Sequence, residues 1–127
     1  VNLSQGYNNS SMKLAERIEI LRKYFESIGM KLTYGDRVVA SYQDSDGIYR
    51  NRDTNAICIE VQYENCFYDY SSKEWKSNEC ELEIHILSNG LWAIETITFE
   101  ENVILGYFTE DVAKTILESL AKRKTLG

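Results

Sequence analysis

The chain has 127 residues, of which 43% are hydrophobic and 27% charged, and its formal net charge is −6 at pH 7. This length predicts one domain with a core of its own, and the composition excludes general disorder. No apolar run approaches the ~18 residues that a membrane span needs, so we expect no membrane association. The three cysteines form no CxxC pair, which favours reduced thiols and a cytoplasmic location.

Polar and charged residues are distributed unevenly along the chain. Residues 1–11 are interpreted as a polar leader, either disordered or foreign to the natural chain, and residues 12–127 as a single α+β domain. Residues 53–111 hold two basic and thirteen acidic residues, whereas the segments on either side are net positive. The negative charge is therefore concentrated in the middle of the chain.

Two amphipathic helices are predicted, one towards each end. Within residues 10–29 the apolar side chains recur at spacings of four and three, which places them on one stripe: Leu14, Ile18, Leu21, Phe25 and Ile28. Gly29 suits the position just beyond the end of this helix. Thr109 is the expected cap of a second helix over residues 110–124, with acidic residues in its first turn.

Between the helices the apolar period changes to two, which predicts short strands. The expected strands are 37–43, 56–63, 66–70, 79–87, 91–99 and 103–108. The expected connections are the turns 44–49, 50–55, 64–65, 88–90 and 100–102 and the loop 71–78. The sequence thus predicts an α+β, two-layer sandwich: an antiparallel sheet of five or six strands with the N-terminal and C-terminal helices on one face. The other face is left to water or to a partner.

The stretch ECELEIH (79–85) suggests what that second face does. Its acidic residues share one parity with His85, and its apolar residues share the other. We expect the acidic parity to point away from the helices, as either a solvated surface or a docking surface for a basic partner. Aromatic residues within the acidic section favour docking, although each one could instead pack in the core. The predicted partner-binding residues are Glu79, Glu81, Glu83, His85, Glu60, Tyr70 and Trp75.

Specific chemistry is not indicated by any motif: GxxxxGK[ST], GxGxxG and GxSxG are absent. His85, the only histidine, could act as a base oriented by Glu83 or Glu95, but we expect no Ser or Cys nucleophile at matching parity. A zinc site is not expected from Cys58, Cys66, Cys80 and His85, since positions 80 and 85 face opposite sides of a strand. A hairpin turn explains DSDG (44–47) better than a calcium loop does. We therefore expect no catalytic, cofactor-binding or metal-binding residue.

The favoured function is a small acidic protein-binding module that neutralises or inhibits a partner with a basic surface, as immunity proteins and inhibitors do. Direct binding of nucleic acid is not expected, since that requires clustered lysine and arginine. One alternative is a secretion-type chaperone or homodimeric client-binding domain, and both monomer and homodimer stay open. A second is a small-molecule-binding or hydrolytic domain, with a pocket between sheet and helices that contains Cys58, Cys66 or His85.

Overall fold

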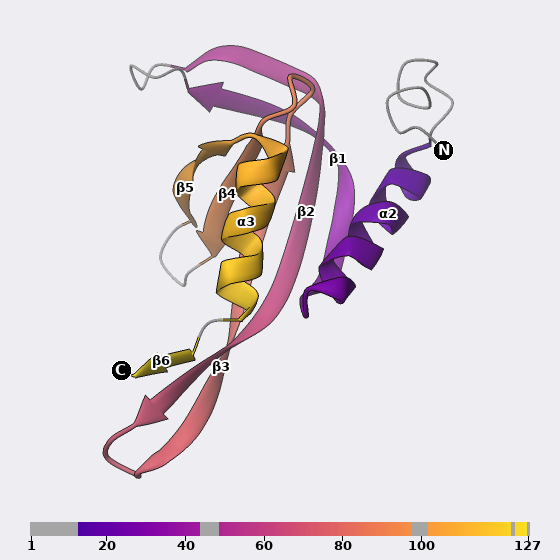
Figure 1. Cartoon of the computed structure of the whole chain (residues 1–127). Coiled ribbons are helices and arrows are strands. Elements are labelled where there is room, and N and C mark those ends of the chain that lie inside the picture. Colours follow the sequence, from indigo (N-terminus) through magenta and orange to yellow (C-terminus); the bar gives the residue numbers. More distant parts are fainter. Residues whose placement is uncertain (1–12, 44–48, 98–101, 123, 127) are drawn as a thin grey trace.

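The computed structural model describes residues 13–43, 49–97, 102–122 and 124–126 (Figure 1). Its elements are α2 (Leu14–Ser27), β1 (Lys31–Gln43), β2 (Tyr49–Asp69), β3 (Glu74–Ile86), β4 (Trp92–Ile97), β5 (Asn102–Phe108), α3 (Glu110–Ala121) and β6 (Lys124–Leu126). Three predictions fall outside the described residues: the leader 1–11, the turn through Asp46-Gly47 and the turn at Glu100-Glu101.

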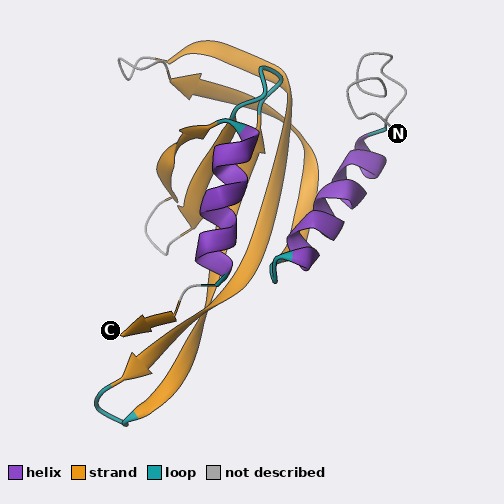
Figure 2. Ribbon diagram, in the orientation of Figure 1, coloured by secondary structure: helices purple, strands orange, loops and turns teal. Residues whose placement is uncertain are grey.

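The strands form one sheet in the order β1-β2-β3-β4-β5, in which every neighbouring pair is antiparallel. The short strand β6 is an addition that was not predicted; it runs parallel to β2 beside residues 66–68. One helix precedes the sheet and the other follows it (Figure 2). The predicted α+β sandwich is therefore confirmed.

Both helices follow from local sequence signals. The apolar stripe of α2 buries Ile18 and Phe25, and the helix ends before Gly29, whose φ of +89° is the left-handed conformation that glycine adopts without a Cβ penalty. At the start of α3, Thr109 is the predicted cap: its side-chain oxygen accepts a hydrogen bond from the backbone N–H of Val112 at 3.4 Å.

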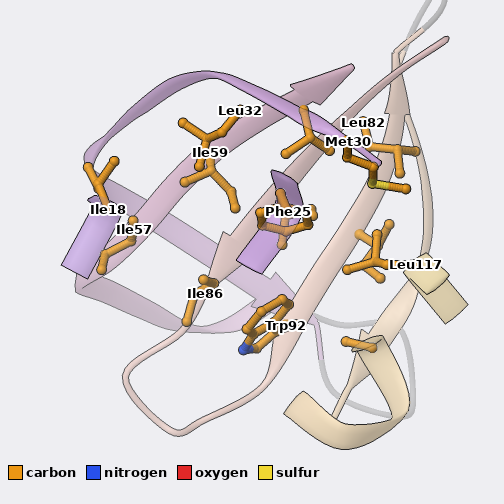
Figure 3. Packing of buried hydrophobic residues seen from close by; sticks show 14 residues of the cluster. Ile18, Phe25, Met30, Leu32, Ile57, Ile59, Leu82, Ile86, Trp92 and Leu117 are labelled. Atoms are coloured by element: carbon orange, nitrogen blue, oxygen red, sulfur yellow. The ribbon is translucent and has the colours of Figure 1, made fainter. Parts of the chain in front are cut away.

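The main core lies between the helices and one face of the sheet (Figure 3). Phe25 of α2 and Leu117 of α3 are completely buried there, together with central residues of three neighbouring strands: Ile57, Ile59, Val61, Leu82, Ile84 and Ile94. Those of β2 and β3 have the parity predicted to face the helices. The opposite parity of β2, β3 and β4 consequently points away from both helices.

That second face is not simply a flat solvated surface. A smaller apolar cluster lies on it, formed by Ala40, Ala56 and Leu87 with partly buried neighbours. Tyr42 of β1 and Tyr107 of β5 meet within this cluster, with ring centroids 6.2 Å apart, although β1 and β5 are the opposite edges of the sheet. The sheet therefore curves until its edges approach, and the face away from the helices is the concave side.

Two predicted connections are wrong because long-range pairing extends the strands through them. Residues 50–55 and 64–65 belong to β2, a single strand of 21 residues, and Glu64 and Asn65 pair with Glu79 and Asn78 of β3. The residues 66–70 are thus not a separate hairpin mate of β2. Local turn preference is a weak signal compared with a ladder of cross-strand hydrogen bonds.

The predicted loop 71–78 is also mostly strand. The actual turn spans residues 70–73, where Lys73 has φ +57° and its N–H donates to Asp69 O at 2.8 Å. Strand β3 resumes at Glu74, so β2 and β3 extend together as a two-stranded arm beyond the helices (Figure 1). Strand β1 likewise begins at Lys31, six residues before the predicted start.

Candidate functional site

A row of carboxylates crosses the concave face of the sheet. Glu60 of β2 lies directly opposite Glu83 of β3, which in turn lies directly opposite Glu95 of β4. A second like-charged pair, Glu64 and Glu79, lies further along the same two strands. We call Glu60, Glu64, Glu79, Glu81, Glu83 and Glu95 the carboxylate row. Like charges directly opposed on neighbouring strands destabilise a sheet, so this arrangement has an energetic cost.

Lysine and arginine do not offset this cost within the described ranges. There, ion pairs of these residues lie on the helices and the arm instead, where they join Arg22 to Glu19, Lys114 to Glu110 and Lys76 to Asp69. The row is instead contacted by neutral amides. Gln62 Nε2 donates to Glu81 Oε1 at 3.0 Å, and Asn102 Nδ2 donates to Glu83 Oε2 at 3.3 Å. The row therefore keeps most of its negative charge.

The centre of the row is where its side chains are least exposed. The Glu83, Glu95 and His85 side chains are 21%, 17% and 23% exposed, and His85 Nε2 lies 3.5 Å from Glu83 Oε2 and 4.0 Å from Glu95 Oε2. His85 thus lies beside both glutamates. The His85 ring therefore lies against the centre of the row.

Glu83 and Glu95 titrate as a pair. Burial, followed by the hydrogen bond to Glu83 and the charge of Glu83, raises the pKa of Glu95 to about 7. Burial would also raise the pKa of Glu83, but hydrogen bonds from Glu95 and Cys58 and the nearby His85 outweigh it, and the Glu83 pKa is lowered. Near neutral pH the two carboxyl groups therefore share one proton, which relieves part of their repulsion.

Cys58 corrects one prediction. A cysteine does lie at matching parity, because Cys58 of β2 is directly opposite His85 of β3. Its Sγ donates to Glu83 Oε1 at 3.4 Å, and the residue is only 7% exposed. Burial, followed by the charges of Glu83, Glu60 and Glu95, raises the pKa of the thiol to about 12. In this environment the thiol is not an activated nucleophile.

The other two cysteines lie elsewhere. Cys80 pairs with Tyr63 at the parity of the helix-covered face, and Cys66 pairs with Ser77 along the arm. Cys80 and His85 thus face opposite sides of the sheet, as predicted, and the four-residue zinc site is excluded. The alternative prediction that Cys58 and His85 line a pocket between the sheet and the helices is also wrong, since both residues lie on the concave face.

The aromatic residues predicted to bind a partner form a separate group at the tip of the arm. Tyr70 and Trp75 are 62% and 52% exposed, and both pack edge-to-face against Tyr68, with ring centroids 4.9 Å and 5.6 Å away. Trp75 lies ten residues from His85 along β3, a separation of roughly 30 Å for an extended strand. The predicted residues therefore divide into the carboxylate row and this aromatic tip.

An open groove lies on the surface beside Glu79 and Glu81 of the row. It has a volume of about 580 Å³ and lies where β4 has ended while β3 continues. Its lining combines carboxylates of the row with apolar side chains: Tyr63, Glu79, Cys80, Glu81, Leu82, Thr96 and Ile97. A basic side chain with an apolar stem would find suitable contacts along it.

A comparison of the chain with protein-family models, with curated proteins and with solved structures gives no significant match. Among the described residues, no helix has the length and apolar character needed to cross a membrane. Any functional proposal must therefore be based on the geometry and charge of the carboxylate row and of the aromatic tip.

Proposed function

We propose that this protein is a small acidic protein-binding module that neutralises or inhibits a partner with a basic surface. The observation that supports the proposal is the direct opposition of Glu60, Glu83 and Glu95 across three neighbouring strands. Such a row is unfavourable in the isolated protein, and cationic side chains of a partner would offset the repulsion. The chain thus retains a surface whose charge is compensated best in a complex.

The aromatic tip supplies a second kind of contact. Exposed tyrosine and tryptophan side chains are the residues that most often anchor protein–protein interfaces, and Tyr70 and Trp75 lie at the end of the two-stranded arm. In this proposal the carboxylate row steers a basic partner towards the sheet and the aromatic tip holds it. The partner's basic surface is of the kind that binds phosphates, so the module competes with nucleic acid rather than binding it.

The proposal places the protein in the cytoplasm. Cys58, Cys66 and Cys80 are free, in keeping with a compartment where thiols stay reduced.

Charge reversal outside the centre of the row tests the proposal. The protein is immobilised, its partner is captured from the native host at low salt, and the dissociation constant of the purified pair is measured by calorimetry. Glu79→Lys combined with Glu81→Lys changes two exposed side chains of the row. We expect it to weaken binding at least tenfold, or about 1.4 kcal/mol. Binding should also weaken steeply towards about 1 M salt, where the Debye length is about 3 Å.

A matched control carries the same charge change on the other side of the molecule. Glu16→Lys combined with Glu19→Lys alters two exposed carboxylates of α2 and should leave the dissociation constant within twofold of the wild type. Equal losses in both double variants would mean that only net charge matters. An unchanged affinity in Glu79→Lys/Glu81→Lys would contradict a role for the row.

One feature favours the alternative of a homodimeric or client-binding domain. The edge strand β5 exposes three consecutive apolar side chains: Val103, Ile104 and Leu105 are 47%, 38% and 48% exposed. An exposed apolar edge is a surface on which another strand can pair. For this alternative, light scattering should give a dimer that Val103→Lys dissociates, while Val39→Lys on the opposite edge has no effect. A monomeric wild type at micromolar concentration counts against it.

A further inference from the structure

Three side chains at the centre of the concave face bring together ligand atoms of three chemical types. A Cys58 sulfur, a Glu83 carboxylate oxygen and a His85 ring nitrogen all lie within 4.8 Å of one another. The Cys58 Sγ to Glu83 Oε1 distance is 3.4 Å, and the His85 Nε2 to Glu83 Oε2 distance is 3.5 Å. In a tetrahedral zinc site with bonds of about 2.0–2.3 Å, neighbouring ligand atoms lie about 3.3–3.6 Å apart. Cys58 Sγ and His85 Nε2 thus each lie about one such edge from Glu83, one from each of its two carboxylate oxygens.

The backbone holds these three residues on rigid elements. Cys58 and His85 are directly opposed across β2 and β3, and Glu83 lies two residues from His85 on the same face of β3. The neighbours of Cys58 along the chain, Ile57 and Ile59, are 1% and 0% exposed, which locks this part of β2 into the main core. Ligands carried by central strands are held more accurately than ligands carried by loops.

Two neighbouring residues, Glu95 and Asn102, could supply a fourth ligand and a hydrogen bond to a ligand. Glu95 Oε2 lies 4.0 Å from His85 Nε2, so either this carboxylate or a water molecule can occupy a fourth position. Asn102 Nδ2 donates to Glu83 Oε2 at 3.3 Å and orients that carboxylate. Hydrogen bonds of this kind to a ligating side chain raise metal affinity.

The types of ligand select the class of metal. Magnesium and calcium prefer oxygen ligands alone, whereas a thiolate with an imidazole and a carboxylate suits zinc and related transition metals. A divalent cation would also neutralise the most crowded part of the carboxylate row. We propose that Cys58, Glu83 and His85 bind one divalent metal ion of the zinc class, with Glu95 or water as the fourth ligand. This inference does not depend on the proposed function.

Binding has a defined proton balance. The Cys58 thiol loses its proton to solvent, and the resulting thiolate forms the sulfur–metal bond. No electron is transferred, because zinc has no redox chemistry in proteins. The bound ion links β2 to β3, and through Glu95 to β4, so it should stabilise the folded sheet.

Cobalt titration tests the site directly. The full chain is reduced, stripped of metal with a chelator and titrated with Co²⁺. We expect one ion per chain, with a thiolate-to-cobalt charge-transfer band in the near ultraviolet and the intense visible bands of tetrahedral cobalt. One equivalent of Zn²⁺ should abolish both. Weak octahedral bands with no charge transfer would mean adventitious binding to carboxylates alone and would overturn the proposal.

Variants separate the site from the other cysteines and from the rest of the row. Cys58→Ser should abolish the charge-transfer band, and His85→Ala should weaken cobalt binding at least tenfold. Cys80→Ser, on the opposite face, should leave both unchanged, as should Glu79→Lys/Glu81→Lys. A charge-transfer band that survives Cys58→Ser or is lost in Cys80→Ser would contradict the assignment.

A thermal measurement provides a readout that needs no spectrum. Zn²⁺ in excess should raise the melting temperature of the wild type and of Cys80→Ser, but not that of His85→Ala, whose partly exposed side chain can be removed without loss of the core. Circular dichroism checks that each variant is folded. An equal rise in His85→Ala and in the wild type would place the metal elsewhere and overturn the inference.

Discussion

At the scale of single residues, Asp53 is a buried carboxylate whose role is structural. It is 8% exposed and lies in β2, in a segment whose composition predicted a polar turn. Its two oxygens accept hydrogen bonds from the backbone N–H groups of Ser88 at 2.5 Å and Asn55 at 2.8 Å. The first of these bonds ties β2 to the turn between β3 and β4. Asp53 therefore helps to fix the position of this connection.

We expect Asp53→Ala to lower the free energy of unfolding by about 1–3 kcal/mol at neutral pH, since it leaves two partly buried N–H groups without their acceptor. Burial would raise the pKa of Asp53, but the N–H donors of Ser88 and Asn55 outweigh it, so the pKa lies below its ordinary value of 3.8. The stabilisation is thus present above 3.8 and is lost as the pH falls through the folded pKa.

Urea denaturation of the wild type and Asp53→Ala, at neutral pH and at several acidic pH values, measures this difference. Glu26→Ala, which removes an exposed carboxylate from α2, is the control and should change stability by less than about 0.5 kcal/mol. A difference between wild type and Asp53→Ala that grows as the pH falls below 3.8 would have the wrong sign for this explanation.

At the scale of elements, local patterns predicted what depends on neighbours in the sequence. The stripe of α2, the Thr109 cap of α3 and the parity of residues 79–86 were all correct, because periodicity and capping act over one or two turns. Register depends on distant residues instead. Once residues 64–65 are taken for a turn, no ladder joins Cys58 to His85, and their contact could not be predicted.

The same limit explains which parts of the site were missed. Parity alone placed Glu60, Glu83 and His85 on one face, and the structure agrees. Predicting that Glu95 lies opposite Glu83 would have required the register between β3 and β4. The curvature that partly buries these two residues is a property of the whole sheet. The sequence did contain a signal for the orientation of Cys58, because position 58 shares the parity of Glu60. It contained no signal that His85 would lie opposite Cys58.

Gly35 shows how one residue controls the packing of two elements. Gly35 is a residue of β1 and lies opposite Ile59 of β2. A Cβ at position 35 would lie 3.0 Å from both Cδ1 and Cγ2 of Ile18 on α2. We expect Gly35→Ala to destabilise the protein by about 1–3 kcal/mol, because α2 must move away from β1. Thermal or urea unfolding measures the loss.

A double-mutant cycle identifies the cause of that loss. Ile18→Val removes Cδ1, one of the two nearest atoms, so Gly35→Ala should cost less in the Ile18→Val background than in the wild type. Ser41→Ala changes an exposed residue of the same strand and should have little effect in either background. Simple additivity of the Gly35 and Ile18 changes would mean that the two side chains do not clash.

At the scale of the whole molecule, charge and curvature act together. Six of the thirteen acidic residues of positions 53–111, the carboxylate row, lie on one face because β2, β3 and β4 are adjacent, and the curve of the sheet brings them closer. The helices, on the opposite face, carry charged side chains of both signs, which form ion pairs with one another. The molecule therefore has one predominantly negative side and one side of mixed charge.

This asymmetry predicts how stability depends on salt. Raising the ionic strength from about 0.01 M to 0.15 M shortens the Debye length from about 30 Å to about 8 Å and screens the carboxylate row. We expect the melting temperature to rise by roughly a few degrees, given about 0.2–1 kcal/mol for each opposed pair. Calorimetry measures it, and Glu79→Gln, which removes the repulsion with Glu64, should reduce the dependence. A melting temperature that falls with salt would mean that attractive ion pairs dominate.

The position of the turn at the tip of the arm determines what a cut in the chain there would do. The turn at residues 70–73 lies at its tip, away from both apolar clusters, while β2 and β3 are joined by thirteen directly opposed residue pairs from Ile57 to Asp69. A protease that cuts after Lys73 removes one covalent link and none of those pairs. Exposed tips of this kind tolerate nicking and new termini. The molecule can therefore be divided here into two fragments that reassemble by strand pairing.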